Sequence, residues 1–193
     1  YVNGKEACFW PFGYNSFHCD VTGLLNADGK NNVLAVRLEN RPQSSRWYPG
    51  AGLYRNVRLV TTERVHVPVW GTQLTTPHVS AEYASVRLRT TIRNAGDADV
   101  RISTDIIAPD GKIVARKDNS RKINHGQPFE QNFLINAPSL WSPETPYLYK
   151  AVSKIYVDGK QTDEYTTRFG IRSIEIIADK GFFLNGKHRK FQG

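Results

Sequence analysis

The sequence predicts an all-β fold built from antiparallel sandwiches, and two observations carry this prediction. Apolar and polar residues alternate with a period of two, as at Val86 to Arg93 and Val100 to Ile106. Such alternation places one face of a strand on a core and the other in water. No window of helical length shows a period near 3.6 residues, and Gly23 to Ala27 makes at most one helical turn.

Five turns of one type separate the alternating segments. Each consists of Asn or Asp, then Gly, then Lys, and their irregular spacing marks hairpins without a sequence repeat. Asn and Asp tolerate a positive φ angle and Gly adopts one freely, so these pairs close two-residue turns between antiparallel strands. The turns begin at Asn3, Asp28, Asp110, Asp158 and Asn185.

The first 62 residues are expected to form the second part of a domain. They open in mid-hairpin at Tyr1 to Gly4 and continue with expected strands at Leu34 to Leu38 and Leu53 to Val60. The Pro- and Gly-rich stretch Arg41 to Gly52 between these strands is a long loop. So few strands leave open sheet edges, which pair readily with other chains. We therefore expect self-association through residues 1–62.

Cys8 and Cys19 are the only cysteines. Two cysteines are too few for a disulfide framework or a four-ligand zinc site. We expect two free, largely buried thiols; a bridge stays open as the alternative, because the flanking residues can lie on adjacent strands. The 5 histidines are scattered without paired spacing, so neither a metal nor a cofactor is expected in this chain.

The block from Arg64 to about Ile177 is expected to form one complete sandwich. Its strands include Phe129 to Ile135, and about eight strands at this density fit an immunoglobulin-like sandwich of about 100 residues. Trp141 is expected to plug one end of the core. Gly170 is expected to let two backbones approach at a domain junction.

The net charge of +8, from 26 basic and 18 acidic residues, does not predict a nucleic-acid partner. Arg87 and Arg89 alternate with apolar residues and so lie on the solvent face of a strand, and the dense basic cluster Lys187 to Lys190 is short. No apolar run approaches the roughly 20 residues that span a membrane. Neither nucleic acid nor a membrane is expected as a partner.

Three segments carry a resemblance to a known family. They are Ser45 to Arg55 (SRWYPGAGLYR), Pro138 to Tyr149 (PSLWSPETPYLY), and Arg168 to Glu175 (RFGIRSIE) followed by Gly181 to Lys187 (GFFLNGK). In this order and at this separation they resemble family 2 glycoside hydrolases of the β-galactosidase type. The corresponding parts of that family are the end of a sugar-binding jelly roll, the immunoglobulin-like domain, and the junction into the catalytic (β/α)8 barrel.

The resemblance implies a division into three parts. Residues 1–62 would be the C-terminal part of the jelly-roll sandwich, residues 63–178 the immunoglobulin-like β-sandwich, and residues 179–193 the start of the barrel. The chain contains no Met, which adds to the expectation that it is a segment of a longer protein. Because the family's two catalytic glutamates lie on the barrel, no catalytic residue is expected in this chain.

The loop residues Arg46, Trp47 and Tyr48 are the candidate substrate-binding residues. In the family this loop approaches the active site, and aromatic faces beside a guanidinium suit the apolar faces and hydroxyls of a pyranose. Packing within the loop, the commoner role of such residues, is the alternative. Some galactosidases place an acidic side chain here that helps to hold sodium; this chain has Ser44, Ser45 and Arg46, so no metal role is expected.

The sequence thus predicts a non-catalytic part of a retaining glycoside hydrolase that acts on terminal β-linked sugars. Carbohydrate would be the partner of the full-length enzyme, which is also expected to form an oligomer. A stand-alone carbohydrate-binding or adhesion module is the alternative, since sandwiches host many functions; the hairpin around Asn185 favours the enzyme. Galactose, glucuronic acid and mannose are not distinguished. Localisation stays open, with export to the periplasm or secretion as one alternative.

Overall fold

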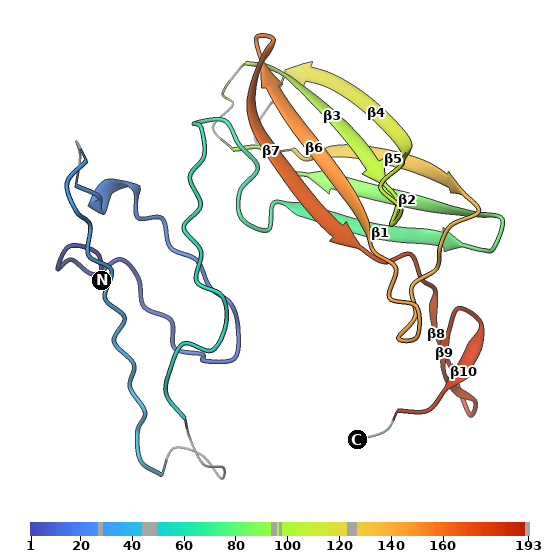
Figure 1. Cartoon of the computed structure of the whole chain (residues 1–193), viewed down its shortest axis with the longest axis horizontal. Helices are drawn as coiled ribbons and strands as arrows, with labels where there is room; N and C mark the ends of the chain where they lie inside the picture. The colour runs from blue at the N-terminus through green and yellow to red at the C-terminus, as the bar shows by residue number, and fades with distance from the viewer. Residues whose placement is uncertain (27–28, 44–49, 94–95, 97, 123–126, 192–193) are drawn as a thin grey trace. The chain divides into compact units, whose positions relative to one another are not determined.

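The computed structural model describes residues 1–26, 29–43, 50–93, 96, 98–122 and 127–191, and Figure 1 shows its course. The chain divides into two compact units, Tyr1–Val60 and Thr61–Gly193. Helix in the described residues is limited to the 3-10 turn η1 (Thr22–Leu24), and all other regular elements are strands. The all-β prediction is confirmed. None of the described helices could cross a membrane.

The second unit contains a sandwich of two antiparallel sheets (Figure 1). The three-stranded sheet has the order β1-β2-β5, made of β1 (Thr72–Val79), β2 (Tyr83–Thr90) and β5 (Phe129–Asn136). The four-stranded sheet has the order β4-β3-β6-β7, made of β3 (Asp99–Ile107), β4 (Ile113–Lys122), β6 (Tyr149–Val157) and β7 (Lys160–Phe169). The chain changes sheet after β2, β4 and β5, as in immunoglobulin-like sandwiches.

Period-two alternation builds the core of this sandwich. On β2, Val86 and Leu88 are buried while Arg87 and Arg89 are exposed. The same alternation on β3, β5 and β6 brings apolar side chains of both sheets together, among them Ile102, at 0% exposure. Burial of each such side chain contributes about 1.5–3 kcal/mol. The charged residues of β2 and β5 thereby lie on the outer face of the three-stranded sheet.

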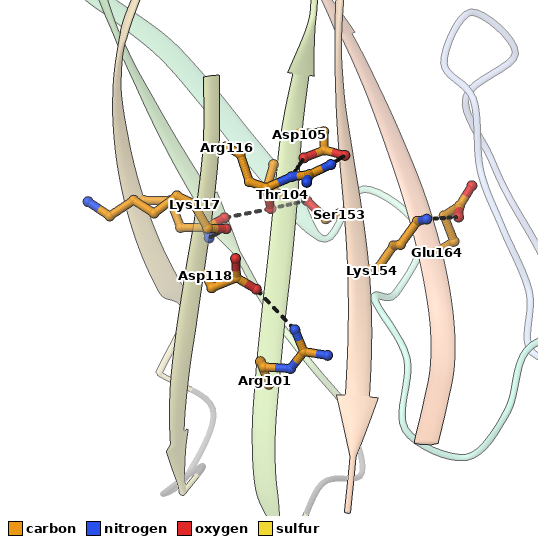
Figure 2. A network of polar contacts seen from close by, with 10 residues as sticks. Arg101, Thr104, Asp105, Arg116, Lys117, Asp118, Ser153, Lys154 and Glu164 are labelled. Carbon is orange, nitrogen blue, oxygen red and sulfur yellow. Dashed lines mark hydrogen bonds and ion pairs between the residues drawn. The ribbon is translucent and has the colours of Figure 1, made fainter. Parts of the chain in front are cut away.

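A polar network lies inside the core, centred on Gln131 of β5. Gln131 is fully buried, and its Oε1 accepts a 2.7 Å hydrogen bond from the Thr104 hydroxyl on β3. The Thr104 and Ser153 hydroxyls lie 2.8 Å apart (Figure 2). Gln131 Nε2 donates to the Lys117 carbonyl and to Asn119 Oδ1, both at 3.1 Å on β4. The network thus joins the two sheets at the level of Gln131.

The β3–β4, β6–β7 and β9–β10 hairpins turn at predicted Asx-Gly pairs. Both φ angles are positive, as a type I′ turn requires, at Asn3-Gly4, Asp158-Gly159 and Asn185-Gly186. Gly111, between β3 and β4, also has a positive φ. Asp28 lies outside the described residues. Asn185-Gly186 closes a small antiparallel sheet at the end of the unit, made of β8 (Ile174–Ile177), β9 (Gly181–Leu184) and β10 (Lys187–Arg189).

The first unit has little regular structure in its described residues. Val2 bridges to Lys5 and to Leu34, but no ladder forms over 34–38 or 53–60, where strands were expected. Backbone hydrogen bonds join Tyr1 to Ala35 and Asn3 to Val33, but alternation alone does not extend such bonds into a ladder. The apolar side chains of both segments lie exposed, with Leu59 at 76%.

A disulfide joins Cys8 to Cys19 in the first unit, with the Cα atoms 6.1 Å apart. The expectation of two free, buried thiols is wrong, and Cys8 is exposed. The physical reason is that the segment between them folds back on itself, which brings the two Cα atoms into the range of 4.4–6.8 Å that a bridge requires.

Candidate functional site

The predicted substrate-binding residues Arg46, Trp47 and Tyr48 lie outside the described residues. The described residues just after this loop hold a second aromatic and arginine pair. Tyr54 is 68% exposed, and the guanidinium carbon of Arg55 lies 5.6 Å from the centroid of the Tyr54 ring. This pair offers a sugar the same combination of an apolar face and hydrogen-bond donors, and the sequence reasoning did not single it out.

The segment closed by the disulfide displays several exposed aromatic rings. Trp10 and Phe17 stack with ring centroids 5.8 Å apart and planes 11° apart. Phe12 and Tyr14 meet edge to face at 5.7 Å, and Tyr14 is 80% exposed. The sequence reasoning missed this cluster as well. The available signal was the density of aromatic residues between the two cysteines.

The small C-terminal sheet is held to the sandwich through Trp141 and Asn185. Trp141 N donates to the Ile171 carbonyl at 2.8 Å, and Asn185 Nδ2 donates to the Trp141 carbonyl at 3.0 Å. A Cβ on Gly170 would lie 2.8 Å from the Trp141 side chain, so only glycine fits there. Trp141 is half-buried against Gly170 and beneath the Arg172 guanidinium, 5.0 Å from its ring centroid.

An ion pair between Glu144 and Arg189 adds to this junction. Both nitrogens of the Arg189 fork donate to the two Glu144 oxygens, Nη2 to Oε2 at 2.7 Å. This donation, with the backbone amide and Ser142 as smaller causes, lowers the pKa of Glu144 to about 2. The carboxylate is therefore ionised at neutral pH. It suits a structural contact and not a general acid, which needs a raised pKa.

The outer face of the four-stranded sheet carries a series of ion pairs (Figure 2). Arg101 pairs with Asp118 at 3.0 Å and stacks over the Tyr156 ring at 4.0 Å. Arg116 donates to both oxygens of Asp105, which holds the pKa of that carboxyl below its ordinary value. The third pair, 3.9 Å apart, joins Lys154 to Glu164. Each of these acidic side chains has a basic partner of its own.

Two of the surface recesses on the described part of the second unit have defined linings. One has a volume of about 130 Å³ and lies on the outer face of the three-stranded sheet, lined by Gln73, Thr75, Arg87 and Arg89. The other, about 550 Å³, is lined by 61–63 and 161–164, three of whose residues are acidic. Across the described residues, no cluster of three His, Cys, Asp or Glu side chains could hold a metal ion.

Comparison with known proteins places this sandwich in a family. The family described as glycosyl hydrolases family 2 matches residues 67–172, more than half of the chain. The chain belongs to glycosyl hydrolase family 2. The matched stretch runs from just before β1 to just after β7, so it covers the immunoglobulin-like sandwich and the start of its junction with the small C-terminal sheet.

Relatives in family 2 cover the whole chain. Beta-galactosidase BoGH2A of Bacteroides ovatus is 40% identical over 100% of this chain and 23% of its own length. A beta-glucuronidase of Bacteroides fragilis is 30% identical over 100% of this chain and 30% of its own. A crystal structure of a family 2 member from Bacteroides cellulosilyticus superposes with a TM-score of 0.87 at 33% identity, over 100% of this chain and 27% of that one. The chain thus spans less than a third of each relative.

Proposed function

We propose that this chain is a non-catalytic part of a retaining glycoside hydrolase that releases terminal β-linked sugars, of the β-galactosidase type. The proposal rests on the similarity of this chain to a beta-galactosidase. The two are 40% identical over the whole of this chain, which covers 23% of that enzyme's length. The enzyme reaction needs two carboxyl groups about 5–5.5 Å apart, one of them with a raised pKa.

The carboxyl groups of the described residues support a structural role. Wherever a shift is resolved, at Glu82, Asp105, Asp110 and Glu144, the pKa is lowered, in each case chiefly by a hydrogen bond to the side chain. Asp163 Oδ2 accepts from the Val67 amide at 2.8 Å and so fixes the entry into the sandwich. These carboxylates act as hydrogen-bond acceptors, which is the opposite of what an acid catalyst requires.

In this proposal the sandwich of residues 63–178 is a scaffold, and the small C-terminal sheet leads into the catalytic barrel from residue 179 onward. The contacts of Asn185 and Arg189 fix where that barrel begins relative to the sandwich. Residues 1–62 belong to the sugar-binding jelly roll, and Arg46, Trp47 and Tyr48, extended by Tyr54, touch the substrate. No cofactor is part of the proposed chemistry.

The test is a hydrolysis panel with the full-length enzyme that carries this chain. We expect nitrophenyl β-galactoside to be cleaved with the highest kcat/KM, above the β-glucuronide and β-mannoside. A Trp47→Ala variant is expected to raise KM about tenfold, the loss of one stacking contact of about 1–1.5 kcal/mol. A full-length enzyme that cleaves none of the three substrates would contradict the proposal.

A stand-alone carbohydrate-binding module is the second candidate, and the exposed rings of Trp10, Phe12, Tyr14 and Phe17 favour it. A module of this kind would bind galactose or its oligomers without any barrel. Affinity electrophoresis of the chain in a galactan gel separates the two: retardation that Trp10→Ala abolishes supports the module, and unretarded migration supports the enzyme scaffold.

A further inference from the structure

The outer face of the three-stranded sheet carries two arginines whose place is fixed by the fold. Val86 and Leu88 fill the core at 1% and 0% exposure, so Arg87 and Arg89 between and after them must point outward. Two residues along a strand span about 7 Å. The two positive charges therefore lie side by side on one face.

The strand register surrounds these arginines with polar partners. Arg89 lies opposite Gln73 on β1 and Glu130 on β5, and Arg87 lies opposite Thr75 and Asn132. Gln73 Oε1 accepts a long, 3.5 Å hydrogen bond from Arg89 Nη1. The amide of Gln73 and the hydroxyl of Thr75 thus complete a recess of about 130 Å³ whose wall is made of hydrogen-bonding groups.

Glu130 neutralises this face only in part. Its two oxygens lie 3.7 Å from Arg87 Nε and 3.9 Å from Arg89 Nε, beyond the length of a charge-assisted hydrogen bond. One carboxylate is shared by two guanidinium groups, each of which has five donors. The basic and acidic residues of β1, β2 and β5 are Arg87, Arg89 and Glu130. Two positive charges and one negative charge leave these strands with one excess positive charge.

We propose that the Gln73–Arg89 recess binds an oxyanion carried on a carbohydrate, either the carboxylate of a uronic acid or a sulfate ester. Guanidinium groups match such planar or tetrahedral anions with paired hydrogen bonds. The Gln73 amide and the Thr75 hydroxyl can bond neighbouring sugar hydroxyls. That the anion is carried on a sugar rests on the proposed function, whereas the anion site itself rests on the geometry alone.

The test is an NMR titration of the isotope-labelled full chain with four probes: digalacturonate, a sulfated galactose disaccharide, inorganic sulfate and neutral galactobiose. We expect the Nε signals of Arg87 and Arg89 to shift with the two anionic sugars and not with galactobiose. Inorganic sulfate should bind at least about tenfold more weakly than the anionic sugars, since it makes no contacts through hydroxyls. Sulfate that binds as tightly as both sugars would overturn the carbohydrate part of the proposal.

Two variants are expected to change the affinity for digalacturonate in opposite directions. Arg89→Gln removes donors and a charge and should weaken binding of digalacturonate about tenfold, whereas Glu130→Gln removes the competing carboxylate and should tighten it severalfold. Arg101→Gln on the opposite sheet is the matched control, because its side-chain exposure of 45% is close to the 48% of Arg89. Absence of shifts with both anionic sugars, or equal weakening by Arg101→Gln, would overturn the site. Hydrolysis by the full-length enzyme is a separate readout, so the two proposals can fail independently.

Discussion

The two units of the chain use the same sequence pattern and reach different results. In the sandwich, alternation produces strands with hydrogen-bonded neighbours and a core in which Leu88 and Ile102 are 0% exposed. In the first unit, alternation at 34–38 and 53–60 leaves Val36 at 48% and Leu59 at 76% exposure. Alternation therefore specifies which face of a strand is apolar, but a core forms only where a second sheet covers that face.

The largest expected effect is on the core of the sandwich. Leu88→Ala should lower the free energy of unfolding by about 2–5 kcal/mol, because it removes a buried side chain and leaves a cavity. Leu59→Ala, on an exposed segment of the first unit, should change it by less than about 0.5 kcal/mol. Urea unfolding of the full chain followed by far-UV circular dichroism measures both. Equal losses would show that the two units share one core and would break the comparison.

The buried polar network should give the next largest effect. Gln131→Ala removes one hydrogen-bond partner each of Thr104, Asn119 and the Lys117 carbonyl. It should cost about 1–3 kcal/mol, the penalty for unsatisfied buried groups together with the lost packing. Asn132→Ala, the exposed neighbour on the same strand, is the control and should be close to neutral. The same urea titration measures the free energy of unfolding of both variants. An unchanged value for Gln131→Ala would mean that water replaces the amide.

Self-association of the first unit is expected to be a weaker effect that depends on concentration. We propose that the exposed apolar segments of residues 1–62 pair between copies. Sedimentation velocity should then show a growing dimer fraction at micromolar concentrations. A Val36→Lys and Leu38→Lys double variant should sediment as a monomer. A wild-type chain that stays monomeric throughout this range would refute the proposal.

The smallest effect should come from the exposed Glu144 and Arg189 pair. The pKa of Glu144 is about 2 in the folded chain against 4.5 as its ordinary value. Its contribution is therefore fully present above about pH 4.5 and is lost as the pH falls toward 2. Glu144→Gln should destabilise the small C-terminal sheet at pH 7 and converge with wild type near pH 2. Hydrogen exchange of β10 amides measures this, with Glu175→Gln as the control; a difference that does not vary with pH would contradict it.

The sequence predicted what depends on local pattern. Alternation placed the strands now seen as β2, β3 and β5, and the Asx-Gly pairs placed the β3–β4, β6–β7 and β9–β10 turns, because both act over a few residues. Long-range partners were not predictable. The Glu144 and Arg189 pair joins residues 45 positions apart, and the partners of Gln131 depend on which strands face it. The bridge between Cys8 and Cys19, 11 positions apart, was expected only as the alternative to free thiols, because it depends on how the segment between them folds back.

The candidate sites divide in the same way. Arg87 and Arg89 were correctly predicted on a solvent face, yet their sharing of Glu130 follows only from the pairing of β2 with β5. Arg46, Trp47 and Tyr48 came from family resemblance, and their role stays a prediction. The ring contacts of the aromatic residues between the cysteines were not predictable, because they depend on how this segment folds back.

The central claim is that this chain supports a glycoside hydrolase without containing its catalytic groups. The direct measurement is the initial rate of nitrophenyl β-galactoside hydrolysis by the purified chain beside the full-length enzyme at equal molar concentration. We expect release of nitrophenol by the full-length enzyme and a rate equal to the buffer blank for the chain. Turnover by the chain that persists through a second purification would contradict the claim.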